Sequence, residues 1–216
     1  MATFAELCTD VKLYLHRKDV NIDELIKSEI NQAVQWALQN YDFLYAEGLT
    51  RMTYPAGTLF ANLEDACEDD ISRLKSVQVL SNIEATSGFV IPIVDYDSIQ
   101  NERLMADQAN QDYTYIKGNP VVAFLCSNGF GIYPKSTSDT CLLLHYTKKL
   151  PRLVEDSDTN FVLEYGREFV LNKVLSNMLT FLARDDRQEL ITQRRNESWA
   201  TFTNWDSRIR STTSYD

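Results

Sequence analysis

The sequence predicts an α+β protein, mainly a helical bundle, in which N-terminal and C-terminal helical hairpins pack together and a small antiparallel β-rich subdomain is inserted between them. Apolar residues recur at helical spacing in the first and last thirds of the 216-residue chain, and short strand-like runs fill the middle. Each helical third has an apolar face that the other can cover. We therefore expect a helical domain from residues 1–47 with 151–205, a β-rich subdomain over 48–150 and an extended C-terminal tail over 206–216.

Two helices are expected in the N-terminal third. Thr3 and Glu6 have the spacing of a capping box, and the apolar residues that follow predict a helix over 4–16. Asn21 and Glu24 give a second start signal. The apolar stripe of this second helix extends over about five turns and consists of Ile22, Leu25, Ile26, Ile30, Ala33, Val34, Ala37, Leu38 and Tyr41.

The pattern changes after Gly48, where short apolar runs alternate with Gly, Pro, Ser, Asn or Asp. These runs predict the strands of a small, mostly antiparallel sheet over 49–54, 77–80, 89–94, 121–126, 129–133 and 141–146. A short helix is expected over 96–108, because Ile99, Arg103 and Leu104 keep helical spacing and Asp95 or Asp97 can cap its start.

The chain becomes helical again after Pro151. A broad apolar face predicts a helix over 161–182, capped by Ser157, Asp158 or Thr159 and packed on the second N-terminal helix. A polar break over 184–187 precedes another, mostly polar helix that carries Leu190, Ile191, Trp199 and Phe202. Residues 184–210 contain six arginines and five acidic residues, a net charge of +1, which leaves −11 for the rest of the chain.

Composition excludes several classes of protein. With 44% hydrophobic and 24% charged residues the chain should fold, and no apolar run reaches the ~18 residues that a membrane span needs. The N-terminus lacks the layout of a signal peptide, so we expect synthesis in a cytoplasm without export by that route. The net charge of −10 disfavours general affinity for nucleic acid.

Catalytic and metal-binding groups are scarce. None of the four cysteines belongs to a C-x-x-C pair, which predicts structural thiols at Cys8, Cys67, Cys126 and Cys141. His16 follows the first helix, where an imidazole can interact with the last carbonyls. His145 shares a strand face with Cys141 but has no acidic residue in its run. We therefore expect no catalytic residue, no metal and no cofactor.

Two further local patterns remain. Gly129 and Gly131 follow Asn128 without a phosphate-loop lysine or a following helix, so they predict a hairpin turn. An acidic run allows a solvated loop, calcium binding without the EF-hand spacing, or a repulsive surface along a channel. This run consists of Glu64, Asp65, Glu68, Asp69 and Asp70.

Aromatic and arginine residues gather near the C-terminus. Ordering the tail over 206–216 costs about 1–2 kcal/mol per residue, whereas Ile209 and Tyr215 each recover about 1.5–3 kcal/mol. We therefore expect the tail to need a partner surface. The aromatic residues at three-residue steps allow either a small satellite core or docking to another protein. The candidate partner-binding residues are Trp199, Phe202, Trp205, Arg208, Arg210 and Tyr215.

The order of these elements resembles the head-to-tail adaptor proteins of tailed bacteriophages, also called head-completion or connector proteins. The resemblance rests on the segments Thr3-Phe4-Ala5-Glu6-Leu7 and Trp36-Ala37-Leu38-Gln39-Asn40-Tyr41-Asp42-Phe43, on Gly131-Ile132-Tyr133-Pro134 followed by Cys141-Leu142-Leu143-Leu144-His145-Tyr146, and on Leu150-Pro151 through Asp156-Ser157-Asp158-Thr159-Asn160 into the long helix. Together these segments span nearly the whole chain, although each alone is a structural signature without chemical specificity.

The resemblance implies a virion structural protein located at the neck and assembled in the host cytoplasm. It implies a ring of about twelve copies beneath the portal protein, a channel through which DNA passes without sequence-specific binding, and attachment of tail or nozzle proteins. Two alternatives remain open at this point. One is a non-catalytic phage or bacterial assembly factor that binds a partner transiently, and the other is a hydrolase with a site around Cys126, Cys141 and His145.

Overall fold

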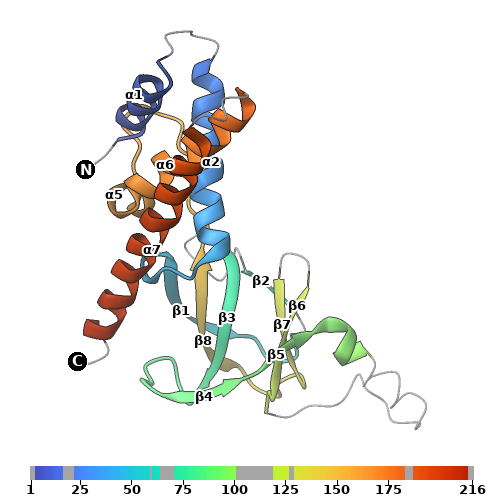
Figure 1. Cartoon of the computed structure of the whole chain (residues 1–216). Helices are drawn as coiled ribbons and strands as arrows, with labels where there is room; N and C mark the ends of the chain where they lie inside the picture. Colours follow the sequence, from blue (N-terminus) through green and yellow to red (C-terminus); the bar gives the residue numbers. More distant parts are fainter. Residues whose placement is uncertain are drawn as a thin grey trace. The chain divides into compact units, whose positions relative to one another are not determined.

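The computed structural model describes residues 3–16, 22–58, 60–63, 71–100, 119–126, 129–182 and 187–213. Helices and largely antiparallel sheets are both present, which confirms the predicted α+β class (Figure 1). The chain forms two compact units. The helical unit comprises Met1–Ala46 with Leu150–Asp216, and the β unit comprises Glu47–Lys149.

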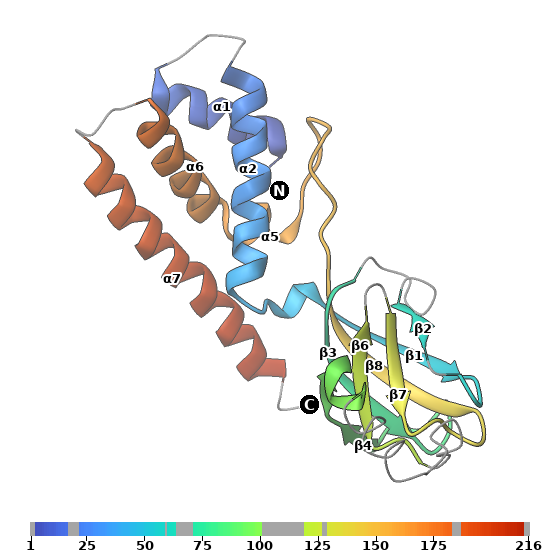
Figure 2. The same cartoon turned by 90° about the vertical axis from the view of Figure 1, so that its right-hand side faces the viewer.

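The helical unit is a bundle of segments from both ends of the chain. Helix α6 packs against α1, α2 and α7, as the sequence predicted for the α2–α6 pair (Figure 2). The elements are α1 (Phe4–Leu15), α2 (Asp23–Asn40), the 3-10 helix η2 (Leu44–Ala46), α5 (Phe161–Tyr165), α6 (Arg167–Phe181) and α7 (Gln188–Thr213).

The first helix begins and ends through local hydrogen bonds. The predicted capping box is confirmed: Thr3 Oγ1 accepts from the Glu6 N–H at 3.3 Å, and Glu6 Oε2 accepts from the Thr3 N–H at 3.1 Å. The helix ends where His16 adopts a left-handed conformation with φ 51°. The backbone N–H of His16, rather than its imidazole, bonds to the last carbonyls.

The two following helix starts differ from the expected ones. Helix α2 has Ile22 at its N-cap with no side-chain capping bond, and the expected cap Asn21 lies outside the described residues. Helix α5 is capped by Asn160, whose side chain accepts from the Leu163 N–H at 3.0 Å. Asp158 instead accepts from the N–H groups of Val154 and Glu155, so the preceding turn uses its carboxylate.

The expected single helix over 161–182 is divided at Gly166 into α5 and α6. A Cβ atom at Gly166 would lie 2.7 Å from the Phe202 ring of α7, closer than a carbon–carbon contact allows. Glycine therefore permits the close approach of α7 at this junction.

The described residues of the β unit form two four-stranded sheets instead of the single expected sheet. The first sheet has the order β1 (Glu47–Tyr54), β8 (Thr140–Lys148), β3 (Ile71–Leu80), β4 (Gly88–Ile91), with every pair antiparallel. The second has the order β2 (Ala61–Asn62), β7 (Gly129–Tyr133), β6 (Val122–Cys126), β5 (Ile93–Asp95), in which β5 and β6 are parallel.

Pro92 explains the division of the expected strand over 89–94. Proline has no N–H to donate to a ladder, and here it separates β4 of the first sheet from β5 of the second. Its carbonyl accepts from the Ala123 N–H at 2.9 Å. Residues 96–100 are helical, in agreement with the start of the expected helix over 96–108, whose remainder lies outside the described residues.

The two sheets share a hydrophobic core. Tyr54 of the first sheet and Phe130 of the second are both fully buried, with ring centroids 5.6 Å apart. The predicted hairpin is confirmed, because β6 and β7 pair antiparallel with Cys126 opposite Gly129.

Candidate partner-binding surface at the end of the C-terminal helix

The inner side of α7 completes the core of the helical unit. Phe202 is 2% exposed and stacks on Phe43 with ring centroids 4.5 Å apart. Trp199 is partly buried, with centroid distances of 4.7 Å to Phe169 and 5.1 Å to Trp36. The sequence allowed either core packing or docking to another protein for these aromatic residues. Phe202 belongs to the core, because it has almost no surface left for a partner.

Trp205 contributes to a different cluster, which is partly open to solvent. Its ring stacks on Tyr165 at 4.1 Å with an interplanar angle of 20° and on Tyr45 at 5.5 Å with the same angle. Tyr165 is 41% exposed and Tyr45 is 48% exposed. Partial desolvation, followed by the charge of Glu164, raises the pKa of the Tyr165 phenol. We call Tyr45, Tyr165 and Trp205 the aromatic stack.

Sequence reasoning found Trp205 but missed both tyrosines of this stack. Tyr45 ends the aromatic run that begins at Tyr41, and Tyr165 lies on the helix that was expected to be ordinary core. The available signal was the run over 41–45, which groups three aromatic rings within five residues just after the second predicted helix.

Asp206 attaches the end of α7 to the rest of the helical unit. Its side chain is completely buried; Oδ1 accepts from the Leu44 N–H at 2.8 Å, and Oδ2 accepts from Arg210 Nε at 2.8 Å. Arg210 also donates from Nη2 to the carbonyl oxygen of Asp42. The hydroxyl of Tyr41 adds a 3.0 Å hydrogen bond to Ser207 Oγ.

These contacts correct the expectation of an extended tail over 206–216 for its first eight residues, because α7 continues as a helix through Thr213; residues 214–216 lie outside the described residues. The cost of ordering this segment is offset by more than the burial of apolar side chains. The buried carboxylate of Asp206 and the guanidinium of Arg210 bond to backbone groups far away in the sequence. Arg210 is therefore half-buried and serves as an internal anchor.

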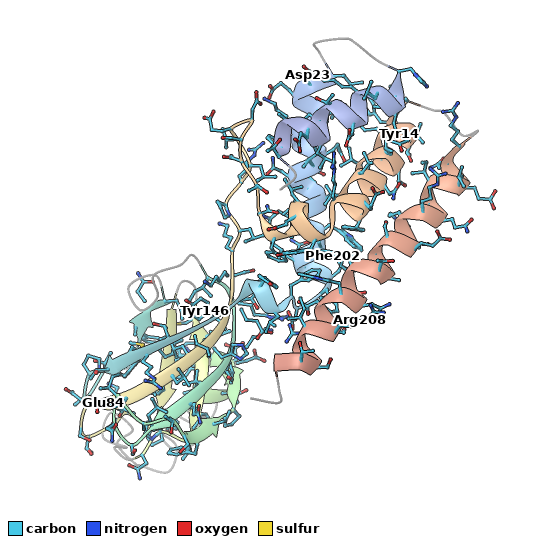
Figure 3. All side chains as sticks on the ribbon, turned by 90° about the vertical axis from the view of Figure 1, so that its left-hand side faces the viewer. Tyr14, Asp23, Glu84, Tyr146, Phe202 and Arg208 are labelled. Carbon is cyan, nitrogen blue, oxygen red and sulfur yellow. The ribbon has the colours of Figure 1, made fainter. Side chains whose placement is uncertain are left out.

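Arg208 lies on the opposite side of the same helical turns and is exposed. Figure 3 shows Phe202 directed toward the other helices and Arg208 directed away from them. The neighbouring hydroxyls of Ser211 and Thr212 bond to carbonyls of their own helix. The structure thus brings Arg208 and the aromatic stack to the surface of the helical unit, while Tyr215 lies outside the described residues.

The acidic run Glu64, Asp65, Glu68, Asp69 and Asp70 lies entirely outside the described residues, so its three readings remain predictions. Cys67 lies there as well. Cys8 is buried, which raises the pKa of its thiol, and Cys126 and Cys141 are half-buried.

His145 has an acidic partner that the sequence did not reveal. Its Nε2 lies 3.0 Å from Glu47 Oε2, and Lys75 Nζ lies 2.7 Å from Glu47 Oε1. The carboxylate comes from β1 and the ammonium group from β3, so no single strand contains this cluster. Cys141 is four residues from His145 on one extended strand, about 13 Å away along the chain, which is too far for a nucleophile–base pair.

Among the described residues, no three His, Cys, Asp or Glu side chains are grouped so that they could hold a metal ion. A search of the same residues finds no helix with the length and apolar character needed to cross a membrane. A search of curated proteins gives no match to the chain. Residues 2–213 match the family model described as SU10 adaptor protein.

Proposed function

Because the chain belongs to the SU10 adaptor protein family, we propose that it is a structural protein of a bacteriophage virion, located at the neck as a head-to-tail adaptor. The nearly full-length family match is the observation that carries this proposal. The protein would form a closed ring of about twelve copies beneath the portal. The ring would extend the DNA channel and provide the platform to which tail or nozzle proteins attach.

The end of α7 is the surface we assign to the portal. Asp206 and Arg210 hold this end in place through Leu44 and Asp42, so its outer side is preorganised. That side presents Arg208, and the aromatic stack offers rings of the type enriched in protein interfaces. Trp205, Arg208 and Tyr215 are the predicted contact residues that this assignment retains, and Phe202 supports them from the core.

The charge of the chain fits passage of DNA without binding. A net charge of −10 gives few cations for phosphate contacts, and repulsion would keep a polyanion from adhering to a channel wall. We assign no catalytic step and no cofactor to the protein. Assembly takes place in the host cytoplasm and the product resides in the virion.

Quantitative mass spectrometry of purified virions tests the proposed function. The chain should be present in a fixed, multiple-copy ratio to the portal protein, because an adaptor remains in the finished particle. A transient assembly factor would be found with assembly intermediates and be missing from virions, and that result would overturn the proposal.

Portal binding tests the assigned surface separately. Arg208→Glu should weaken binding to purified portal at least tenfold, whereas Arg194→Glu, a matched change at another exposed position of α7, should leave binding unchanged. Equal portal binding by the two variants would show that Arg208 does not belong to the interface.

A further inference from the structure

The first sheet ends in two strands, β1 and β4, each with a partner strand on one side only among the described residues. Edge strands present N–H and C=O groups that can pair with another chain. Monomeric proteins commonly protect such edges with charged residues. Within β4 there is no charged residue, and β1 has two, Glu47 and Arg51.

Both charged residues of β1 bind inward, across their own sheet. Glu47 bonds to Lys75 of β3 and to His145 of β8. Arg51 donates from Nη2 to the carbonyl oxygen of Ala85, in the turn between β3 and β4, at 3.2 Å. The charge of Glu47 is therefore paired within its own sheet, and Arg51, although exposed, is bonded back over that sheet.

Apolar side chains remain exposed on the same two strands. Leu49 of β1 is 66% exposed, and Phe89 and Val90 of β4 are 52% and 64% exposed. Val90 of β4 is paired with Gln78 of β3, Gln78 is paired with Leu143 of β8, and Leu143 is paired with Arg51 of β1. Directly paired residues point to the same face of a sheet. Because alternate residues of a strand share a face, Leu49 lies on the same face of the sheet as Val90.

The directions of the two edges are also compatible. Three antiparallel steps separate β1 from β4, so the two strands run in opposite directions. Copies in a ring are related by rotation about one axis, and neighbouring copies in a large ring have nearly the same orientation. The β4 edge of one copy can therefore meet the β1 edge of the next as an antiparallel pair, which is the more stable arrangement.

We propose that neighbouring copies of this chain join by antiparallel pairing of β4 with β1, so that the first sheet continues from one copy to the next. The proposal rests on the adaptor function, which supplies the ring. Val90 of one copy lies beside Leu49 of the next on the outer face, and Phe89 lies near Thr50 and Met52 on the inner face. The contact is head-to-tail and uses a different strand on each side, as a closing ring requires.

Charge substitutions at the two edges test this pairing. Leu49→Lys and Val90→Glu each place a charge that has no partner in the interface, so each variant should raise the concentration needed for ring assembly at least tenfold. The variant with both changes places lysine opposite glutamate at every junction and should recover assembly. Val121→Glu is the matched control, because Val121 is 59% exposed but precedes β6.

Native mass spectrometry of each variant, alone and with purified portal as a template, measures the assembly. Circular dichroism and thermal melting check that each variant folds, as expected for residues so exposed. Single variants that assemble like wild type, or a double variant that stays dissociated, would overturn the pairing. Single variants that form rings but lose a portal or tail protein would also overturn it, because the edge would then serve another partner.

The adaptor function is tested independently by whether the chain is found in purified virions. Wild-type chain found in virions together with edge variants that assemble normally would disprove the strand pairing alone. A chain missing from virions would disprove the adaptor function itself.

Discussion

Asp206 accepts a hydrogen bond from the backbone N–H of Leu44 at 2.8 Å, and its side chain has no exposed surface. The two residues are 162 positions apart in the chain. One carboxylate therefore caps the 3-10 helix η2 and, through Arg210, fixes the last turns of α7.

Replacing Asp206 with alanine should destabilise the helical unit. The change leaves the Leu44 N–H without its buried acceptor, a loss of about 1–3 kcal/mol. It also removes the anionic partner of Arg210, but this guanidinium is 36% exposed and keeps its bond to Asp42, so its share is small. Chemical denaturation measures this free energy of unfolding, and hydrogen exchange should show faster exchange in residues 206–213. Arg208→Ala is the control on the same turns, with an expected change within about 0.5 kcal/mol; equal losses in both variants would contradict the anchoring role.

Phe202→Ala separates core packing from partner binding. Removing a 2%-exposed ring should cost about 3–5 kcal/mol of stability. Arg208→Glu should instead keep the melting temperature and weaken portal binding, because its side chain is exposed. Thermal melting and binding measured on the same preparations compare the two. A Phe202→Ala protein with unchanged stability would show that α7 does not complete the core.

Gly166→Ala should also destabilise the helical unit, because the new methyl group would lie 2.7 Å from the Phe202 ring. The expected loss is about 1–3 kcal/mol, the usual range for overpacking. In a double-mutant cycle, Phe202→Leu should recover part of this loss by removing the clashing atoms. Purely additive free energies of unfolding would assign the cost to the helix junction alone.

The turn before α5 should respond to acid through Asp158. Backbone N–H groups of Val154 and then Glu155 lower the pKa of its carboxyl group below the usual 3.8. Such a group stabilises the folded state fully above its unfolded pKa and loses this contribution as the pH falls through the lower folded value. Asp158→Ala should therefore be less stable than wild type at pH 6.

This difference should shrink toward zero as the pH falls below 3.8. Denaturant midpoints across the acid range measure it. Glu155→Ala is the control, because it keeps Asp158 and both N–H donors; its stability relative to wild type should not show the same loss of difference in acid. A stability difference between Asp158→Ala and wild type that stays constant at every pH would reject the explanation.

Features determined by neighbouring residues were the ones that the sequence predicted well. The Thr3–Glu6 capping box depends on four consecutive residues and is confirmed. The predicted cap of α5 was wrong. Asp158 is a good cap in isolation, but the preceding turn already uses its carboxylate, so Asn160 accepts the hydrogen bond from the Leu163 N–H instead. Competition between two local bonds for one carboxylate is not visible in residue type or spacing.

Features that depend on distant residues were missed. The helical end of α7 needs Asp42 and Leu44, and the partner of His145 is supplied by Glu47 on another strand. The aromatic stack likewise combines Tyr45, Tyr165 and Trp205 from three separate segments. Such sites form only when the fold brings those segments together, so periodicity along one segment cannot predict them.

The division of the chain into units has a consequence for its synthesis. The β unit is continuous from Glu47 to Lys149, so all of its strands are synthesised before α5 and leave the ribosome before the end of α7 does. The helical core instead needs Phe43 from the beginning of the chain and Phe202 from near its end. We therefore expect the nascent β unit to fold first, while the N-terminal helices keep an apolar face open to chaperones until translation is almost complete.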